Sequence, residues 1–274
     1  MQNNEQPKIW DTQNLEQKKI LYSSVAKAYN QTRPTYPIDI INRVVKLTEL
    51  PENATILELG CGPGTATKDF AKLGFSMVCL EPNQEFYQIA KQNLAKYPNV
   101  KIINTSFEEW ELETERFDAV LAATSFHWIS AEIRCKKVAA TLKENGLLIL
   151  LWNTGVLPEN NVSEVLKKVY KKYAPSLAEY ETKESQKESL NNLMKTVINS
   201  GYLTELISEH SVCEIEYKLD EYLLLLNTYS PYLQIDSEKR DLLFKGLRDK
   251  IEDNFGSSLK LSFLSIFQLL KKIK

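Results

Sequence analysis

Glu58-Leu59-Gly60-Cys61-Gly62-Pro63-Gly64 is the stretch of sequence that decides the fold. It follows the apolar run 54–57, and a helical pattern comes after it at 65–73. The next apolar segment, 75–80, ends in Glu81. A buried strand that leads into a glycine loop and a helix, with a carboxylate closing the second strand, is typical of nucleotide-binding sites. We therefore expect a nucleotide-like cofactor at this loop.

The number and spacing of these glycines narrow the choice of cofactor. The chain holds nine glycines in 274 residues, and three of them fall within five positions. A purely structural turn is the alternative, because glycine reaches positive φ freely in turns. Dinucleotide folds prefer G-x-G-x-x-G, whereas here glycines stand at every second position behind an acid. The pattern favours cofactor binding and argues against a dinucleotide.

Composition and charge exclude several classes of function. The net charge of −2 and the pI near 5.9 give no basic footprint, so we expect no nucleic acid partner. No stretch approaches 18 apolar residues, and the polar N-terminus lacks a signal-peptide core. We expect a soluble cytoplasmic protein with no membrane partner. The oligomeric state cannot be read from the sequence.

Metal and disulfide chemistry also look improbable from the cysteine and histidine positions. The four cysteines are scattered without a C-x-x-C pair, and the only histidines are His127 and His210. These are too few ligands for a zinc or iron–sulfur site. We assign no metal, and we interpret Cys61 as a small packing residue rather than a nucleophile.

The order of expected elements predicts an α/β fold. Strands at 54–59, 76–81, 100–104, 117–123 and 146–152 alternate with helices at 65–73, 83–96 and 131–143. Helices are also expected at 15–30 and 38–47 before this region, and at 221–228 and 237–253 after it, with strands near 213–217 and 259–269. Alternation of strands and helices implies parallel crossovers, an open doubly wound sheet, and a ligand at the carboxyl ends of the strands.

Four further motifs extend the pattern across nearly the whole chain. They are Tyr29-x-x-x-Arg33-Pro34-x-Tyr36-Pro37, Thr105-Ser-Phe-Glu108, Phe126-His-Trp128 and Tyr229-Ser-Pro-Tyr232. Together with E-x-G-x-G-x-G they resemble the class I S-adenosylmethionine (SAM) dependent methyltransferases, and among them the methyltransferase-domain-11 and trans-aconitate methyltransferase-like family. The resemblance implies a Rossmann-like, seven-stranded, mostly parallel sheet in the order 3-2-1-4-5-7-6, with helices on both faces and a helical lid.

The resemblance also implies a division of the chain into four parts. Residues 1–50 would form an N-terminal helical cap, and 51–153 the SAM-binding core. Residues 154–208 would be a helical insertion that acts as the acceptor lid, and 209–274 would complete the sheet. We further expect the segment 15–37 to be mobile without SAM and to close over it, because its charge has few partners.

Roles carry over from the family to matching residues. Tyr29 and Arg33 would cover SAM, with Arg33 available to its carboxylate; the alternative is that Arg33 pins the N-terminal helix to the core. Glu58 would sit beneath the loop and hold its N–H groups or the SAM ammonium. Glu81 would accept both ribose hydroxyls, because one carboxylate accepts two bonds at once. Either acid could instead be an ordinary surface residue.

The adenine end of the cofactor would lie after the third strand. Ser106 stands where many relatives carry Asp, so its contact with adenine is expected to be weak, and Phe107 would stack near the purine or pack in the core. The resemblance places the following residues at the cofactor: Tyr29, Arg33, Glu58, Leu59, Gly60, Cys61, Gly62, Gly64, Thr65, Glu81, Pro82, Asn83, Ser106, Phe107, Glu108, Ala123 and Thr124.

The end of the fourth strand would face the methyl group. His127 would act as a base or orient the substrate, since an imidazole titrates near neutral pH, or it would be a loop histidine bonded to backbone. Trp128, Trp152 and Tyr232 would line the acceptor pocket, although tryptophans are more often core residues.

These expectations predict SAM-dependent methyl transfer to a small molecule whose accepting group is a carboxylate, a hydroxyl or an amine. One alternative is a noncatalytic SAM-binding regulatory protein. The other is an NAD-dependent oxidoreductase, which the glycine spacing disfavours.

Overall fold

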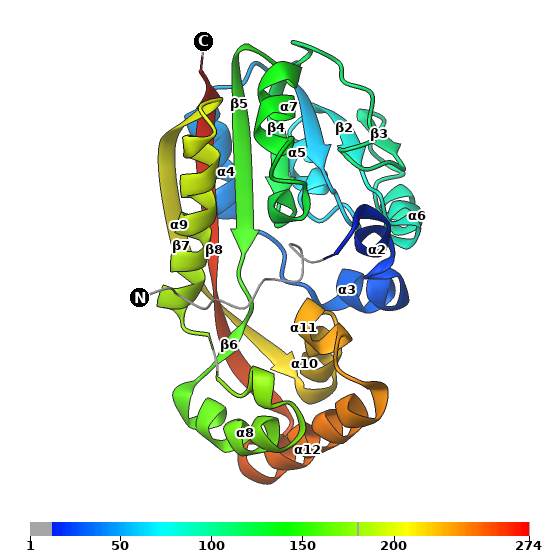
Figure 1. Ribbon diagram of the computed structural model, residues 1–274, viewed down its shortest axis with the longest axis vertical. Helices are drawn as coiled ribbons and strands as arrows, with labels where there is room; N and C mark the ends of the chain where they lie inside the picture. The colour runs from blue at the N-terminus through cyan, green and yellow to red at the C-terminus, as the bar shows by residue number, and fades with distance from the viewer. Residues whose placement is uncertain (1–12, 180, 274) are drawn as a thin grey trace.

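The computed structural model describes residues 13–179 and 181–273, which build one twisted sheet with helices on both faces and a helical lobe below it (Figure 1). The strands are β1 Thr55–Leu59, β2 Ser76–Leu80, β3 Val100–Ile103, β4 Phe117–Ala123, β5 Leu142–Asn153, β6 Leu157–Pro158, β7 Leu203–Lys218 and β8 Ser258–Lys272. Their order is β3-β2-β1-β4-β5-β8-β6, and β7 pairs with β8.

This order confirms the expected doubly wound sheet. Strands β1 to β5 are parallel, and β8 runs antiparallel to β5 on one side and to β7 on the other. The two-residue β6 continues the line of β5 along β8, so the sheet has eight strands rather than the seven expected.

The helices follow the apolar periodicity, with one clear difference at the N-terminal side. They are α2 Leu15–Ile20, α3 Ala26–Thr32, α4 Ile38–Thr48, α5 Thr67–Lys72, α6 Gln84–Asn93, α7 Arg134–Thr141, α8 Asn160–Tyr173, α9 Lys183–Asn199, α10 Leu219–Leu226, α11 Ser230–Leu233 and α12 Ser237–Phe255. The single helix expected at 15–30 is broken, because the 3₁₀ turn Ser23–Val25 separates α2 from α3.

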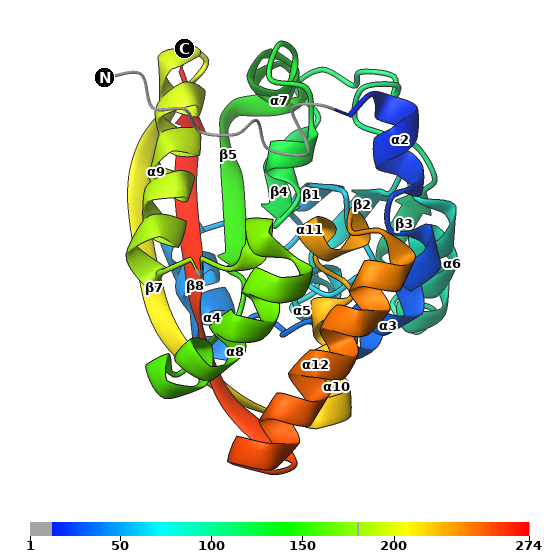
Figure 2. The same cartoon turned by 60° about the horizontal axis from the view of Figure 1, so that its bottom comes forward.

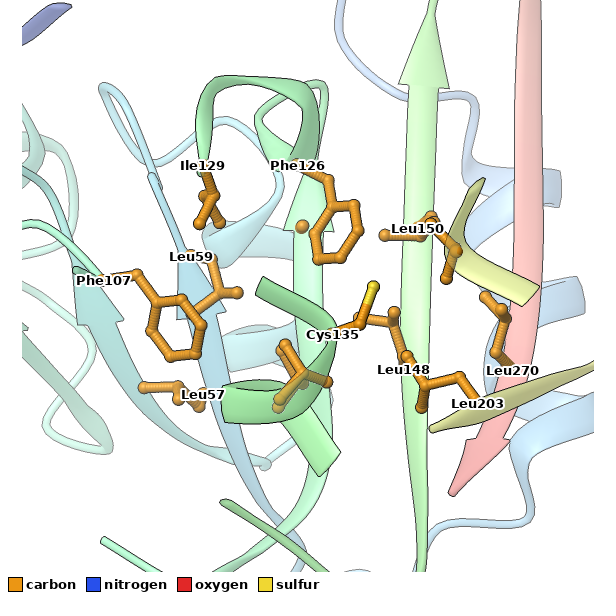
Figure 3. Close-up of a cluster of buried hydrophobic side chains, with 14 of the residues drawn as sticks. Leu57, Leu59, Phe107, Phe126, Ile129, Cys135, Leu148, Leu150, Leu203 and Leu270 are labelled. Atoms are coloured by element: carbon orange, nitrogen blue, oxygen red, sulfur yellow. The ribbon is translucent and has the colours of Figure 1, made fainter. Parts of the chain in front are cut away.

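Two apolar clusters hold these helices against the sheet. On one face, α4, α5 and α6 cover side chains such as Ile56 and Met77. On the other face, Leu57 and Leu59 of β1 meet Cys135 of α7 and the leucines of β5 (Figure 3). Full burial of one such side chain contributes about 1.5–3 kcal/mol. Successive side chains of a strand therefore pack on opposite faces of the sheet. Because helices cover both faces, a ligand is expected at the carboxyl ends of the strands.

A third cluster joins α8, α10 and α12 with the lower parts of β7 and β8, and we call α8, α10, α11 and α12 the helical lobe (Figure 2). Leu166 of α8 and Leu247 of α12 are both fully buried in this cluster. The boundary expected at residue 208 therefore falls inside β7, and the segments on its two sides share one core. Residues 1–12 of the expected cap lie outside the described residues. Within the described part of the chain, no helix is long and apolar enough to span a bilayer.

Candidate functional site

The glycine loop begins where β1 ends, at the carboxyl edge of the sheet. Gly60, Gly62 and Gly64 all have positive φ, at 66°, 56° and 87°. These conformations are costly for other residues. A side chain added at Gly62 would meet no atom within 4 Å, whereas one at Gly64 would come within 2.8 Å of Leu94. The backbone at Gly62 is thus open on the side where a ligand could lie against it.

Glu81 links the loop to the end of β2. Its two carboxylate oxygens accept the backbone N–H groups of Gly62 at 2.7 Å and of Asn83 at 2.8 Å. Burial raises the pKa of Glu81 to about 7, because its side chain is removed from water. Each carboxylate oxygen has two lone pairs, so Glu81 retains acceptor capacity for a further pair of donors.

Asn83 fastens the same edge to the N-terminal segment. Its Oδ1 caps α6 by accepting the N–H groups of Glu85 and Phe86. Its Nδ2 donates to the carbonyl of Lys19 at 2.6 Å and to Ser23 Oγ at 2.9 Å. The turn that breaks the expected N-terminal helix is therefore held directly against the cofactor edge.

Glu58 lies on β1 and is fully buried. Its Oε2 accepts from Thr67 Oγ1 at 2.6 Å and from Cys79 Sγ at 3.7 Å. Its Oε1 has no hydrogen-bond partner among the described residues. The expectation that Glu58 holds loop N–H groups is wrong, because Glu81 makes that contact. Burial raises the pKa of Glu58 to about 8.

These two acids and the loop fit a cofactor with a hydroxyl pair and a positive charge. Glu81 can accept hydrogen bonds from the hydroxyls. Glu58 Oε1, which has no partner among the described residues, can accept a further hydrogen bond. A positively charged ligand nearby would favour the ionised form of both carboxyls. SAM has both features, so the chemistry of the residues present suits it.

The Arg33 guanidinium makes hydrogen bonds and aromatic contacts within the protein. Its Nε donates to Thr228 Oγ1 at 2.9 Å and its Nη2 to the Thr228 carbonyl at 2.7 Å. The guanidinium carbon lies 4.6 Å from the ring centre of Tyr29 and 4.0 Å from that of Tyr229. The premise that this segment has few partners for its charge is wrong: Arg33 joins α3 to the helical lobe. The lobe and α3 lie side by side in Figure 1.

A cavity of about 270 Å³ opens between α3 and the glycine loop. Its lining combines loop residues with two cations, and it comprises Asn30, Arg33, Thr35, Pro63, Gly64, Thr65, Lys68 and Asn93. The corner therefore suits a small anionic group such as a carboxylate. Lys68 was not singled out in the sequence, since one lysine on a short helix carries no pattern.

The residues expected at adenine are occupied by contacts within the protein. Ser106 Oγ donates to Glu109 at 2.8 Å, and Glu108 accepts the N–H of Ser130 at 3.0 Å. Phe107 is 3% exposed and stacks on Trp110 with ring centres 6.1 Å apart. Of the two roles weighed for Phe107, the structure therefore shows core packing.

Strand β4 ends in a strained residue. Thr124 has φ 56°, which is unusual for a β-branched side chain. Its hydroxyl lies 2.7 Å from the Tyr36 hydroxyl and accepts the N–H of Asn153 at 3.2 Å. Ser125, the next residue, donates to the carbonyl of Leu59. The ends of β1, β4 and β5 are thus tied together at the expected position of the methyl group, and Tyr36 and Asn153 belong to this group although neither was among the expected site residues.

The aromatic residues expected around the acceptor divide into two places. The His127 ring lies 5.4 Å from Trp128 and 5.6 Å from Trp152, centre to centre. Trp152 is 3% exposed and donates from Nε1 to Gln268 at 3.1 Å, so it is mainly a core residue. Tyr232 lies apart from them in the helical lobe, with its hydroxyl 2.6 Å from that of Tyr170.

Residues 153–156, which we call the joint, connect β5 to the lobe. Asn153 Nδ2 donates to the carbonyls of Pro34 and Thr35. The Gly155 carbonyl accepts from Gln186 Nε2 at 3.0 Å, and the N–H of Val156 donates to the Tyr229 hydroxyl at 3.1 Å. Four segments that are distant in sequence therefore meet at the joint. No local sequence motif predicts this meeting.

Comparisons with known proteins agree on a family. A family model described as a methyltransferase domain matches residues 56–146. An uncharacterized methyltransferase-like protein of Schizosaccharomyces pombe is 34% identical over 156 residues, which cover 56% of this chain and 59% of that protein. The chain thus spans little more than half the length of this relative.

Solved structures share the fold at low identity. The YcgJ protein of Bacillus subtilis covers 87% of this chain and 100% of its own, with 14% identity and a TM-score of 0.54. A Haemonchus contortus phosphoethanolamine N-methyltransferase 2, in complex with phosphomonomethylethanolamine and S-adenosylhomocysteine, covers 96% of this chain and 58% of its own, with 13% identity and a TM-score of 0.51.

Proposed function

We propose that the chain is a class I SAM-dependent methyltransferase, which transfers the methyl group of SAM to a small-molecule acceptor; its similarity to the methyltransferase domain and to the Schizosaccharomyces pombe relative supports this. The observation that carries the proposal is the contact between Glu81 and the glycine loop, which holds a carboxylate with spare acceptor capacity beside the open backbone at Gly62. That arrangement suits the ribose of an adenosyl cofactor. The finer likeness to the trans-aconitate methyltransferase group remains part of this proposal.

The residues of the site would hold the cofactor by three kinds of contact. Glu81 would accept the ribose hydroxyls, and the backbone of Gly60 and Gly62 would lie against the ligand. Arg33 and Lys68 line the corner that would take the methionyl carboxylate. When bound, SAM supplies a methyl group on a sulfonium, which is electrophilic without further activation.

The protein's own contribution would be alignment and exclusion of water. Holding the acceptor in line with the methyl group can supply roughly 7–11 kcal/mol of the barrier. Arg33 is bonded to Thr228, which lies between α10 and α11, so the N-terminal segment and the helical lobe would together cover the carboxyl ends of the strands. His127, whose ring contacts those of Trp128 and Trp152, would orient an acceptor or take its proton.

Calorimetric titration with SAM, S-adenosylhomocysteine and NAD tests the cofactor. We expect both adenosyl ligands to bind and NAD to give no heat of binding. Binding of NAD in preference to the adenosyl ligands would favour the oxidoreductase. Transfer of labelled methyl from SAM to a pool of small molecules then tests catalysis, and binding of SAM with no transfer would leave the noncatalytic alternative.

A further inference from the structure

Two amide oxygens at the joint are buried and accept no hydrogen bond from the part of the chain that the structure describes. They are Oδ1 of Asn153 and Oε1 of Gln186. Gln186 comes from α9 and is only 6% exposed, while Asn153 is the last residue of β5. Buried polar groups are nearly always hydrogen-bonded. Two unpaired acceptors near the joint are therefore candidates to bind a ligand that donates hydrogen bonds.

The identity of these atoms is fixed by their neighbours. Asn153 Nδ2 donates to the carbonyl oxygens of Pro34 and Thr35, at 3.1 and 3.2 Å. Exchanging its nitrogen and oxygen would bring oxygen against oxygen in both contacts. The unpaired atom of Asn153 is therefore an acceptor.

The same argument holds for Gln186. Its Nε2 donates to the Gly155 carbonyl at 3.0 Å and to the Glu181 carboxylate at 3.1 Å. A carbonyl and a carboxylate both accept hydrogen bonds, so neither partner donates to Gln186. Both amides thus present oxygen, and not N–H, as the atom left unpaired.

The joint begins at the carboxyl edge of the sheet, where the proposed methyl transfer would take place. Asn153 ends β5 at the carboxyl edge of the sheet, and its N–H donates to Thr124 at the end of β4. The guanidinium of Arg33 is already bonded to Thr228 and stacked between two tyrosine rings.

We propose that the methyl acceptor is an amine whose N–H groups donate to Asn153 Oδ1 and Gln186 Oε1. This inference rests on the proposed methyl transfer. A carboxylate brings only lone pairs to these oxygens, and a hydroxyl brings one donor, whereas an amine brings two N–H groups and keeps a lone pair for attack. The ammonium form of the amine first releases a proton to water. The lone pair of the neutral nitrogen then forms the bond to the methyl carbon as the carbon–sulfur bond breaks, and the electron pair of the broken bond stays on sulfur. The methylated ammonium product releases a second proton to water.

Ligand-observed NMR with the protein saturated by S-adenosylhomocysteine tests the ligand class without turnover. The probes are benzylamine, benzyl alcohol and benzoate, with matched sets on phenethyl and butyl skeletons. We expect the amines to bind and the carboxylates of the same skeleton to give no signal. Transfer of deuterated methyl from SAM should label the same amines.

Two variants separate the acceptor oxygen from the shape of the joint. Gln186→Met keeps the length of the side chain and removes its oxygen, so amine binding should weaken about tenfold. Glu181→Gln disturbs the same contact but leaves Oε1 in place, so amine binding should be unchanged. Thermal melts report whether each variant folds; if Gln186→Met does not, the comparison of ligand classes on the wild type decides.

The outcomes distinguish this inference from the function beneath it. If S-adenosylhomocysteine does not bind, the proposed function fails. If it binds and carboxylates or alcohols bind or are methylated in preference to amines, the amine proposal alone is overturned. Equal amine binding by wild type and folded Gln186→Met also overturns it.

Discussion

The glycine-loop edge and the joint are two polar places at the same end of the sheet, and they are built differently. The loop edge contains two buried carboxylates, Glu58 and Glu81, whose pKa values burial raises to about 8 and about 7. At the joint, the amide oxygens of Asn153 and of the neighbouring Gln186 accept no hydrogen bond from the described residues. The loop edge suits a ligand with positive charge, and the joint suits one with neutral donors. The proposed methyl transfer needs both kinds of surface, because SAM is a cation and the nucleophile must keep a lone pair.

The largest expected effect lies in the loop. Gly62→Val should abolish binding of S-adenosylhomocysteine, because it fills the open side of the backbone, while the left-handed φ of 56° costs roughly 1–2 kcal/mol of stability. Gly201→Val is the matched control: Gly201 has φ 76°, also with no atom within 4 Å of an added side chain. Calorimetric titration and thermal melts should show similar losses of stability and a loss of binding in Gly62→Val alone. Retained binding would remove the loop from the site.

A substitution at His127 tests whether this residue takes a proton during methyl transfer. If its imidazole takes a proton, His127→Asn should slow methyl transfer by about 10²–10⁴-fold, and the wild-type rate should rise through neutral pH. His210→Asn, on the exposed part of β7, should leave the rate unchanged. Rates measured from pH 5.5 to 9 decide. A decrease of a few-fold with no titration would assign His127 to positioning.

The burial of the Glu58 carboxyl should appear in the pH dependence of the unfolding free energy. Its pKa is raised from 4.5 to about 8, so its contribution to folding is fully present below about pH 4.5 and is lost as the pH rises through 8. The difference in unfolding free energy between wild type and Glu58→Gln should therefore change by a few kcal/mol, against the wild type, across this range. Urea unfolding at several pH values measures it, with Glu209→Gln, at a surface ion pair with Arg43, as the control. A difference that stays constant with pH contradicts a buried, protonated Glu58.

Glu81 should have a smaller effect, on affinity. Glu81→Gln should weaken SAM binding by about 1.5–3 kcal/mol, as for hydrogen bonds to a charged group. Because binding favours the ionised carboxylate and the free pKa is about 7, wild-type affinity should rise from pH 6 to 8, and the variant should lose this slope. Titrations at three pH values test both parts. Affinity that is unchanged in the variant would remove Glu81 from the cofactor.

The smallest effect concerns the contact between cap and lobe. Arg33→Ala removes two hydrogen bonds and the stacking on Tyr29 and Tyr229, which should cost about 1–2 kcal/mol. Hydrogen exchange should accelerate in both 26–37 and 228–233. Arg43→Ala, which breaks the exposed pair with Glu209, should cost under about 1 kcal/mol and leave both segments protected. Unchanged exchange at 228–233 in Arg33→Ala would show that the cap and lobe are not coupled.

The sequence predicts the loop edge well because its parts are local. The glycines, Glu58 and Glu81 lie within 24 positions, and strand periodicity places both acids at one edge of the sheet. The sheet order also follows, since the alternation of strands and helices and the family resemblance leave few topologies. Which carboxylate holds the loop could not be predicted, because both follow apolar residues and only the register of β1 against β2 separates them.

The joint could not be predicted for a different reason. Its partners Pro34, Gln186 and Tyr229 are up to about 195 positions apart, and the bond from Arg33 to Thr228 spans the same distance. Asn153 and Gln186 have no motif around them, and an amide in a loop or helix is usually solvated. The N-terminal helix was overextended because Ser23-Ser24 fits a helical pattern, whereas contacts to Asn83 favour a turn.

The position of strand β8 in the chain implies an order in which the parts of the sheet assemble. Strands β1 to β5 are joined by short crossovers, whereas β8 begins at Ser258, 105 positions after β5 ends at Asn153. Closing a longer loop costs more entropy, and non-local pairing is slow. β7 pairs with β8 and with no other described strand, so it can join the sheet only through β8. We expect strands β1 to β5 and the glycine loop to fold first. The joint then forms in a final, rate-limiting step, when β7 and β8 dock.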